Sequence, residues 1–449
     1  MKAWGVARQE ALLALGRVRN NVPVAEALTA SHHATNLSAK DRALLTQLVY
    51  GVLRQRRYLD AVMEPFVRQE LEPDIRDILR MGFYQLKFLS RIPAYAVVNA
   101  AVEQTKAIQP KASRLVNAVL RRGQQYEPAN LTLAVQYSHP DWLVARWAER
   151  FGSRLPEILA ENNKIPPLTL RVNRTKASRD EILEELRQLN IEAEPSQYVP
   201  EAIRVMGSLW LEDFPWFQKG WVSVQDESGM LVSHVLDPQP GDRILDLTAG
   251  VGGKTGHLAE LTHGQAKILA VDASAPRLTL LRKNLERLGV IEGVTSQIGY
   301  AKSILATIGR TQAFNKVLVD APCSNLGVLR RRVDARWRKQ EQNLVENQTL
   351  QRDLLAAAID VTESGGTIVY STCSIEPEET TEVVATIVEQ FANVHTDSVI
   401  PYLPSPLLNA ASTDGMLTIV PGDYGMDGFF IARLLKDAED DGVKGNDAN

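Results

Sequence analysis

Two cysteines are the only thiols in this chain of 449 residues, and both stand where a strand is expected to end. Cys323 comes shortly after the apolar run 316–319 and Asp320, and Cys373 follows the apolar run 367–370. Ligands of an open α/β sheet bind beyond the carboxyl ends of its strands, and adjacent strands lie ~4.8 Å apart. We therefore expect both thiols to face one substrate. For either cysteine alone, the alternative is a small buried hydrophobic side chain.

A thiolate and a carboxylate at one edge of a sheet suit attack on a pyrimidine ring. Carbon 5 of a pyrimidine is a poor nucleophile, but a thiolate that adds to carbon 6 makes carbon 5 reactive toward a methyl donor. Asp320 could protonate or hydrogen-bond the ring nitrogen N3 of that adduct. A second thiol or a nearby base could assist the final release. Three acidic residues after Cys373 are expected to cap the next helix rather than to activate the thiol, namely Glu376, Glu378 and Glu379.

A glycine-rich turn in residues 244–255 separates a predicted strand from a predicted helix. Glycines let the backbone approach a ligand closely, and free N–H groups at a helix start favour negative groups. Asp272 ends the next predicted strand, 26 residues after Asp246, where a carboxylate can accept hydrogen bonds from ribose hydroxyls. Thr248 stands where a phosphate loop needs glycine, which excludes that motif. A tight structural turn is the alternative.

S-adenosylmethionine fits this turn better than a nicotinamide dinucleotide, because a pair of thiols has no role in hydride transfer. The residues predicted to bind it are Thr248, Ala249, Gly250, Val251, Gly252, Gly253, Lys254, Asp272 and Asp320.

The elements that must position these residues alternate between strand and helix from Trp221 onward. Such alternation predicts a Rossmann-like, doubly wound α/β domain, which we place at residues 216–435. The last strands follow short connections and could include an antiparallel pair. The acidic tail 436–449 is expected to be disordered. The predicted strands are Arg243–Leu247, Lys267–Val271, Thr295–Ile298, Lys316–Val319, Gly366–Tyr370, Met416–Val420 and Phe429–Arg433.

Two further regions precede this domain. Residues 1–128 show apolar side chains at helical spacing and few β-branched runs, which predicts an all-α bundle. Ser38 is a predicted helix N-cap with Asp41 as its partner. Residues 129–215 predict a connection and a small α+β subdomain, for which an RRM-like arrangement is one candidate. It lacks the aromatic motif with which RRM domains stack bases, so no base readout is assigned to it.

Composition and charge bound the class of protein. A hydrophobic content of 45% and a charged content of 23% are typical of an ordinary globular protein. No run of about 18 apolar residues occurs, and the N-terminus lacks the apolar core of a signal peptide. Two cysteines exclude a disulfide framework in practice, so we expect a cytoplasmic protein. We further expect a monomer that has no membrane span and binds no metal.

The net charge of −4 is unevenly distributed. Residues 1–130 hold 19 basic and 11 acidic residues, which gives +8, and the remainder carries −12. A basic module on an acidic body suggests a polyanionic partner such as nucleic acid. Ordinary solvated helix faces are the alternative.

A second basic segment follows Cys323 closely. Positive charges interleaved with an indole suit phosphate contact and base stacking. A solvated face is again the alternative. A target base must leave its stack to reach a thiol, so a loop or another exposed stretch of RNA is the expected substrate. The predicted RNA contacts are Arg330, Arg331, Arg336 and Trp337.

The stretches around both cysteines resemble the two cysteine motifs of RNA cytosine-C5 methyltransferases. With a front that resembles the NusB-like RNA-binding domain, the likeness spans nearly the whole chain and is greatest to the bacterial 16S rRNA enzymes of the Sun/Fmu type. It implies a Rossmann-like fold, S-adenosylmethionine as methyl donor and 16S rRNA as substrate. It also implies that Cys373 is the nucleophile and that Cys323 assists product release. The matching stretches are 50–54, 79–86, 116–121, 171–173, 225–228, 320–323, 371–374, 377–379 and 427–430.

Two stretches depart from the pattern of that family. Thr248, Gly250 and Val251 replace a Cys, an Ala and a Pro of the cofactor turn, but three glycines remain, so cofactor binding should survive. Tyr300 replaces an acidic residue that holds adenine, and we expect its ring to stack on or cover the adenine. The competing interpretations are a tRNA cytosine-C5 methyltransferase and a non-catalytic RNA-binding assembly factor.

Overall fold

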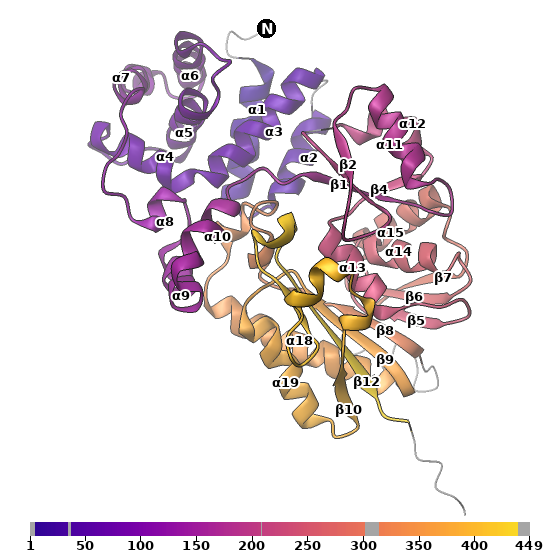
Figure 1. The fold of residues 1–449 in the computed structure, drawn as a ribbon. Helices are drawn as coiled ribbons and strands as arrows, with labels where there is room; N and C mark the ends of the chain where they lie inside the picture. The colour runs from indigo at the N-terminus through magenta and orange to yellow at the C-terminus, as the bar shows by residue number, and fades with distance from the viewer. Residues whose placement is uncertain (1–4, 35–36, 208, 301–313, 439–449) are drawn as a thin grey trace, which may run out of the picture. The chain divides into compact units, whose positions relative to one another are not determined.

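The computed structural model describes residues 5–34, 37–207, 209–300 and 314–438. The chain divides into two compact units (Figure 1). One unit combines residues 1–165 with 329–341, and the other combines 166–328 with 342–449. The helical unit continues past residue 128, and a short segment that follows Cys323 also belongs to it. None of the helices in the described ranges has the length and apolar character needed to cross a membrane.

The first unit is all-helical, as predicted for residues 1–128. Ser38 is the N-cap of α3, where its hydroxyl accepts a hydrogen bond from the Asp41 N–H at 3.2 Å. The core is formed by apolar side chains at helical spacing, such as Leu45, Leu48 and Leu79. Its α-helices are α1 Val6–Arg19, α2 Val24–Ala34, α3 Ala39–Arg54, α4 Arg56–Met63, α5 Pro73–Phe88, α6 Ala94–Ile108, α7 Ser113–Gly123, α8 Leu133–Gln136, α9 Asp141–Phe151, α10 Leu155–Glu161 and α17 Ala335–Arg338.

The second unit begins with a small antiparallel sheet in the order β2-β3-β1-β4. Its strands are β1 Leu168–Val172, β2 Ala193–Pro195, β3 Ala202–Val205 and β4 Val222–Val224. Helix α11 (Arg179–Gln188) starts with a capping box of Ser178 and Glu181, and α12 is Pro215–Gln218. The small sheet extends past the boundary predicted at residue 215, because β4 pairs with β1.

The large sheet of this unit has the order β10-β12-β9-β8-β5-β6-β7, with β11 paired to β12. Strands β5 to β9 pair in parallel, and β12 runs antiparallel to its three neighbours, so the predicted Rossmann-like architecture is confirmed. The strands are β5 Arg243–Asp246, β6 Lys267–Asp272, β7 Val294–Ile298, β8 Phe314–Asp320, β9 Thr362–Thr372, β10 Val394–Asp397, β11 Leu417–Ile419 and β12 Phe429–Lys436.

Helices cover both faces of the large sheet because alternate strand residues point to opposite sides. Ile244 packs in a core with α13, α14 and α15, whereas the adjacent Leu245 packs in a core with α18 and α19 (Figure 1). In β12, Ile431 packs in the first of these cores and the adjacent Phe430 packs in the second. These helices are α13 Glu227–Leu236, α14 Gly253–Leu261, α15 Ala275–Leu288, α18 Gln342–Val361 and α19 Thr381–Gln390.

All seven predicted strands of this domain are present, with shifts of a few residues at their ends. Strand β10 was not predicted. The predicted tail begins too early, because β12 continues through Lys436, whose ammonium donates to the carbonyl of Thr362 at 2.7 Å. The remainder of the tail from residue 439 lies outside the described residues.

Candidate functional site

The two thiols lie together at the carboxyl edge of the large sheet. Strands β8 and β9 are parallel neighbours, and Asp320 is paired in register with Ser371. The Sγ atoms of Cys323 and Cys373 are 3.2 Å apart, and both cysteines are free thiols. Two residues separated by fifty positions therefore face the same space, as the strand pattern predicts.

The loop after Cys323 is held against Cys373 by specific contacts. The side-chain oxygen of Asn325 lies 3.3 Å from Sγ of Cys373, and its amide donates to the Cys323 carbonyl at 3.0 Å. The N–H of Gly327 donates to the Cys373 carbonyl at 3.0 Å. A Cβ at this glycine would lie 2.3 Å from the Gly428 carbonyl oxygen, so only glycine fits.

The thiols differ in their electrostatic surroundings. The hydrogen bond to Cys373, together with burial, raises the pKa of Cys323 well above its ordinary value. Cys323 is 7% exposed, whereas Cys373 is less deeply buried. Cys323 therefore keeps its proton at neutral pH and can donate it in a hydrogen bond to the Cys373 sulfur.

Asp320 links the thiol loops to the glycine-rich turn. One carboxylate oxygen accepts a hydrogen bond from Ser371 Oγ at 2.9 Å, and the other lies 2.6 Å from the Lys254 ammonium. The Asp320 carbonyl accepts a hydrogen bond from the Thr248 hydroxyl at 2.9 Å. Lys254 also lies 5.4 Å from the ring centroid of Phe429. Asp320 is thus an oriented carboxylate beside a cation.

Glu379 has a different role from the helix cap predicted for it. It is fully buried, and its carboxylate accepts hydrogen bonds from the backbone N–H of Ser324 at 2.7 Å and from the Ser324 hydroxyl. The Asn347 amide donates to it at 2.7 Å. The hydroxyls of Ser324 and Ser374 are 3.3 Å apart, so Glu379 positions the loops that follow both cysteines. Neither Glu376 nor Glu378 is the N-cap of α19, because that position is held by Thr380.

The glycine-rich turn lines a cavity of about 340 Å³. Gly250 and Gly252 have φ of 57° and 87°, and a Cβ at Gly252 would lie 2.9 Å from Leu281 Cγ. Asp320 and Phe429 also line the cavity, which is large enough for part of a nucleoside. Of the residues predicted to bind the cofactor, those in the lining are Thr248, Ala249, Gly250, Val251, Gly253, Lys254 and Asp320.

Three of the predicted cofactor residues, Gly252, Asp272 and Tyr300, are not part of this lining. Asp272 accepts hydrogen bonds from the N–H groups of Gly250 and Ser274 at 3.0 and 2.8 Å, so it shapes the turn. Tyr300 is 62% exposed, and its contact with adenine stays a prediction.

The lining contains side chains that were not predicted as site residues. Asp226 is the N-cap residue of α13, Asp427 lies two residues before β12, and Phe429 is the first residue of β12. All three lie in stretches that matched the family pattern, and that match was the signal that could have identified them.

Asp246, at the end of β5, is buried beneath the turn. The Thr255 hydroxyl donates to one carboxylate oxygen at 2.6 Å, and the other oxygen has no hydrogen-bond partner. Burial raises the pKa of Asp246 to about 6, although the hydrogen bond from Thr255 opposes the shift.

Arg171 joins the small sheet to the start of α14. Its guanidinium forms a bidentate ion pair with Glu260, at 2.8 and 3.0 Å, and donates to the Gly253 carbonyl at 2.7 Å. It also donates to the side chain of Gln225. Arg171 therefore holds the start of α14, and with it the end of the cofactor turn, in place.

The RNA contacts predicted for Arg330 and Arg336 do not fit their burial. Arg336 is fully buried, and its guanidinium donates to the carbonyls of Ser138 and Asn162 at 3.1 and 3.0 Å. Arg330 is 3% exposed and lies 3.2 Å from the carboxylate of Glu161. Both side chains stabilise the helical unit from within.

Trp337 is also engaged inside the helical unit. Its indole N–H donates to the Leu53 carbonyl at 2.7 Å, and the Arg56 guanidinium lies 5.2 Å from its ring centroid. Trp337 is half-buried, and its contact with RNA stays a prediction. Arg331 is half-buried, and its RNA contact stays a prediction.

Comparisons with known protein families cover each part of the chain. Residues 6–125 match the NusB family, and residues 139–210 match a ferredoxin-like domain described as RsmF/B-like methyltransferase. Residues 233–435 match the family described as 16S rRNA methyltransferase RsmB/F.

Similar proteins span nearly the whole chain. A Synechocystis protein described as probable ribosomal RNA small subunit methyltransferase B is 37% identical over 421 residues, covering 89% of this chain and 92% of that protein. A Bacillus subtilis protein with the same description is 34% identical and covers 96% and 98%. The crystal structure of PH0851 has a TM-score of 0.83 at 27% identity, covering 97% and 99%. A methyltransferase homologue from Pyrococcus horikoshii has a TM-score of 0.59 at 27% identity, covering 69% and 100%.

The residues of the cavity fit the methyl donor of such enzymes. The glycine turn exposes backbone at positions 250 and 253, and the cavity leads past Lys254 to Asp320. S-adenosylmethionine is the cofactor. The extent of these matches shows that the chain belongs to the RsmB/F family of 16S rRNA methyltransferases.

Proposed function

We propose that the protein methylates C5 of a cytosine in 16S rRNA through a covalent bond between Cys373 and C6 of the base. The observation that carries this proposal is the 3.2 Å separation of the two sulfur atoms beside Asp320. One thiol alone is compatible with many chemistries, whereas two thiols and a carboxylate at one strand edge suit addition to a pyrimidine and its reversal.

Cys373 is the nucleophile in this mechanism. The raised pKa of Cys323 leaves a protonated thiol beside the Cys373 sulfur, and an S–H donor stabilises a thiolate. Attack on C6 forms the C–S bond and moves the ring electrons toward C5 and N3. The same donor stabilises Cys373 when it departs, so Cys323 assists release.

Asp320 acts at the ring nitrogen. Its carboxyl group lines the cavity and is oriented by Ser371 and Lys254. In this step Asp320 is in its protonated form and donates a hydrogen bond or its proton to N3, which stabilises the negative charge that addition of the thiolate creates. S-adenosylmethionine, when bound, supplies the electrophilic methyl group that C5 takes up. The C5 proton then passes to a water molecule, and N3 returns its proton to Asp320. Cleavage of the C6–S bond restores the aromatic base and frees Cys373.

The helical unit supplies RNA contacts in this proposal. Residues 1–130 carry a net charge of +8, and residues 6–125 match the NusB family. A basic surface favours phosphate binding without base readout. The substrate is free 16S rRNA or an early assembly intermediate, and the protein works in the cytoplasm as a monomer.

Transfer of a labelled methyl group tests the proposal. The protein is incubated with 16S rRNA or with tRNA, and bisulfite sequencing locates the modified base. Modification of one cytosine in 16S rRNA is expected. Methylation of tRNA alone would instead assign the protein to the tRNA class, and methylation at a position other than C5 would contradict the thiol mechanism.

A further inference from the structure

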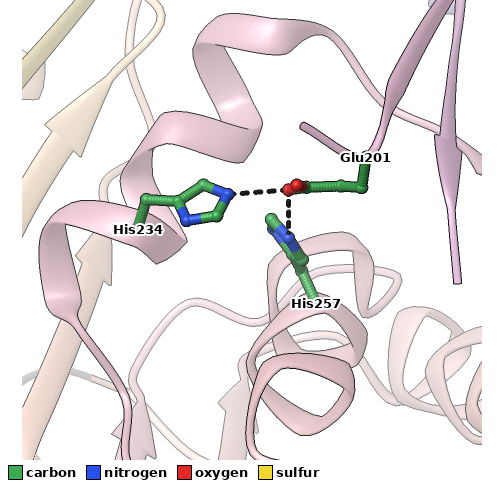
Figure 2. Close-up of side chains that lie close together, drawn as sticks. All are labelled: Glu201, His234 and His257. Carbon is green, nitrogen blue, oxygen red and sulfur yellow. Dashed lines mark hydrogen bonds and ion pairs between the residues drawn. The ribbon is translucent and has the colours of Figure 1, made fainter. Parts of the chain in front are cut away.

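Glu201, His234 and His257 form a cluster that the methyl-transfer mechanism does not use (Figure 2). Glu201 directly precedes β3 of the small sheet, His234 lies in α13 and His257 lies in α14. Both imidazoles point toward the carboxylate in Figure 2. The Nε2 atoms of His234 and His257 lie 2.7 and 2.8 Å from Oε1 of Glu201. None of the three residues lines the cofactor cavity.

The hydrogen bonding of this cluster is incomplete although it is buried. Glu201 is 2% exposed and His257 is 1% exposed. The second carboxylate oxygen of Glu201 and the Nδ1 atom of His257 have no hydrogen-bond partner. The close contact of His257 Nε2 with Glu201 also lacks hydrogen-bond geometry. Buried polar groups are ordinarily paired, so these atoms call for a partner.

The charge of the cluster points to a cation. The carboxylate of Glu201 is buried between two imidazoles, whose Nε2 atoms lie 2.7 and 2.8 Å from its Oε1 atom. Arg171 does not serve as its counter-ion, because that guanidinium is already paired with Glu260. A buried charge without a counter-ion is costly.

We propose that Glu201, His234 and His257 bind one divalent transition-metal ion, with Zn²⁺ as the best fit. Two imidazole nitrogens and a carboxylate oxygen are ligands that Zn²⁺ accepts, and the three ligand atoms lie within 4.8 Å of one another. Bond lengths of ~2.0 Å in a tetrahedral site put ligand atoms about 3.3 Å apart, so the contacts need to open by about half an ångström. The side chain of His234 is 25% exposed, which leaves room for water as a fourth ligand.

The ion has a structural role. It joins the small sheet, through Glu201, to two helices of the large domain. One of them, α14, starts at Gly253 in the cofactor turn. A metal at His257 therefore fixes the helix whose first residues shape the cofactor cavity. This inference does not depend on the chemistry proposed for the thiols, and it departs from the expectation that the protein holds no metal.

Metal binding is tested on the full chain, produced without a histidine tag and stripped with a chelator. Because the thiol pair could itself bind Zn²⁺, the measurements use the C323S/C373S variant as the starting protein. Added Zn²⁺ is followed by elemental analysis after dialysis and by the thermal unfolding temperature, with Mg²⁺ as a comparison. The expected result is one retained Zn²⁺ per chain and an unfolding temperature raised by Zn²⁺ but not by Mg²⁺.

His234→Ala is the main variant, because this partly exposed residue can be removed with less disturbance than His257. His395→Ala is the matched control, since His395 lies in β10 with a side chain 57% exposed. His234→Ala should weaken Zn²⁺ binding at least tenfold and change the visible spectrum of bound Co²⁺, and His395→Ala should do neither. If C323S/C373S retains no Zn²⁺, or if His234→Ala binds it as tightly as the control does, the proposal is wrong and the cluster is a hydrogen-bonded network.

Discussion

Replacement of Glu379 tests whether this carboxylate positions the loop that carries Cys323. Four donors contact it, namely the Ser324 N–H and the Asn347 amide, each at 2.7 Å, the Ser324 hydroxyl, and the more distant Gln351 amide at 3.5 Å. Glu379→Gln keeps the shape but removes the charge. Glu379→Ala removes every acceptor and leaves the buried N–H and hydroxyl of Ser324 and the half-buried amide of Asn347 without this partner.

The magnitudes follow from the number of donors. A hydrogen bond to a charged group contributes ~1.5–3 kcal/mol to stability, and a bond to a neutral group contributes ~0.5–1.5 kcal/mol. Each bond in Glu379→Gln is therefore weaker by about 1 kcal/mol. Because a neutral side chain costs less to desolvate, we expect the free energy of unfolding of Glu379→Gln to fall by about 2 kcal/mol in total. Glu379→Ala should cost about 4 kcal/mol, because each unpartnered buried donor costs ~1–3 kcal/mol. At roughly 2–4 °C per kcal/mol, the unfolding temperature should fall by about 5 °C in Glu379→Gln and by about 10 °C in Glu379→Ala.

The assay combines thermal unfolding with the kinetics of methyl transfer at a temperature where all variants are folded. Displacement of the Cys323 loop should lower kcat of Glu379→Gln at least tenfold and leave the KM for S-adenosylmethionine within twofold. Glu382→Gln, the same change at an exposed site in α19, is the control. If Glu379→Gln matches this control in both stability and kcat, Glu379 does not position the thiol loop.

Three other predictions concern buried charges. Arg171→Met should destabilise the protein by ~3–5 kcal/mol in urea unfolding, because it leaves Glu260 buried without its partner, and Glu260→Gln in the same chain should restore part of the loss. Asp246 has a pKa raised from 3.8 to about 6, so ionising it opposes folding and stability should fall as pH rises from about 4 to about 6. Asp246→Asn should remove about 3 kcal/mol of that fall, measured by urea unfolding at pH 4 and pH 7, and an unchanged pH profile would contradict it. Arg336→Met should lower stability by several kcal/mol in urea unfolding, because Arg336 is fully buried. The dependence of rRNA affinity on salt concentration should have the same slope as in the unchanged protein. A shallower slope would show that Arg336 contacts RNA phosphates after all.

The fold and the thiol pair could be predicted because both follow from periodic patterns. Parallel strands end at a common edge, so an apolar run before each of Cys323 and Cys373 was enough to bring them together. The glycine turn was identified in the same way, from a strand, three glycines and a helix start. Lys254 was assigned to the cofactor, but its ion pair with Asp320 depends on side-chain direction and was not foreseen.

The remaining features depend on contacts that leave no local pattern. Glu379 bonds Ser324 across 55 positions, and a glutamate before a helix looks like a cap in sequence. Arg336 donates mainly to backbone carbonyls, which every residue has, so nothing in the sequence distinguished it from an exposed basic residue. The partners of His257 come from separate elements with no motif spacing.

Trapping of the covalent intermediate tests the central claim most directly. Cys323→Ala and Cys373→Ala are each incubated with a 16S rRNA fragment and S-adenosylmethionine, separated under denaturing conditions and analysed by peptide mass spectrometry. With Cys323 absent, release should slow, and an RNA adduct on Cys373 should accumulate. Cys373→Ala should form no adduct and transfer no methyl group. An adduct on Cys323 in the Cys373→Ala protein would contradict the assignment of the nucleophile.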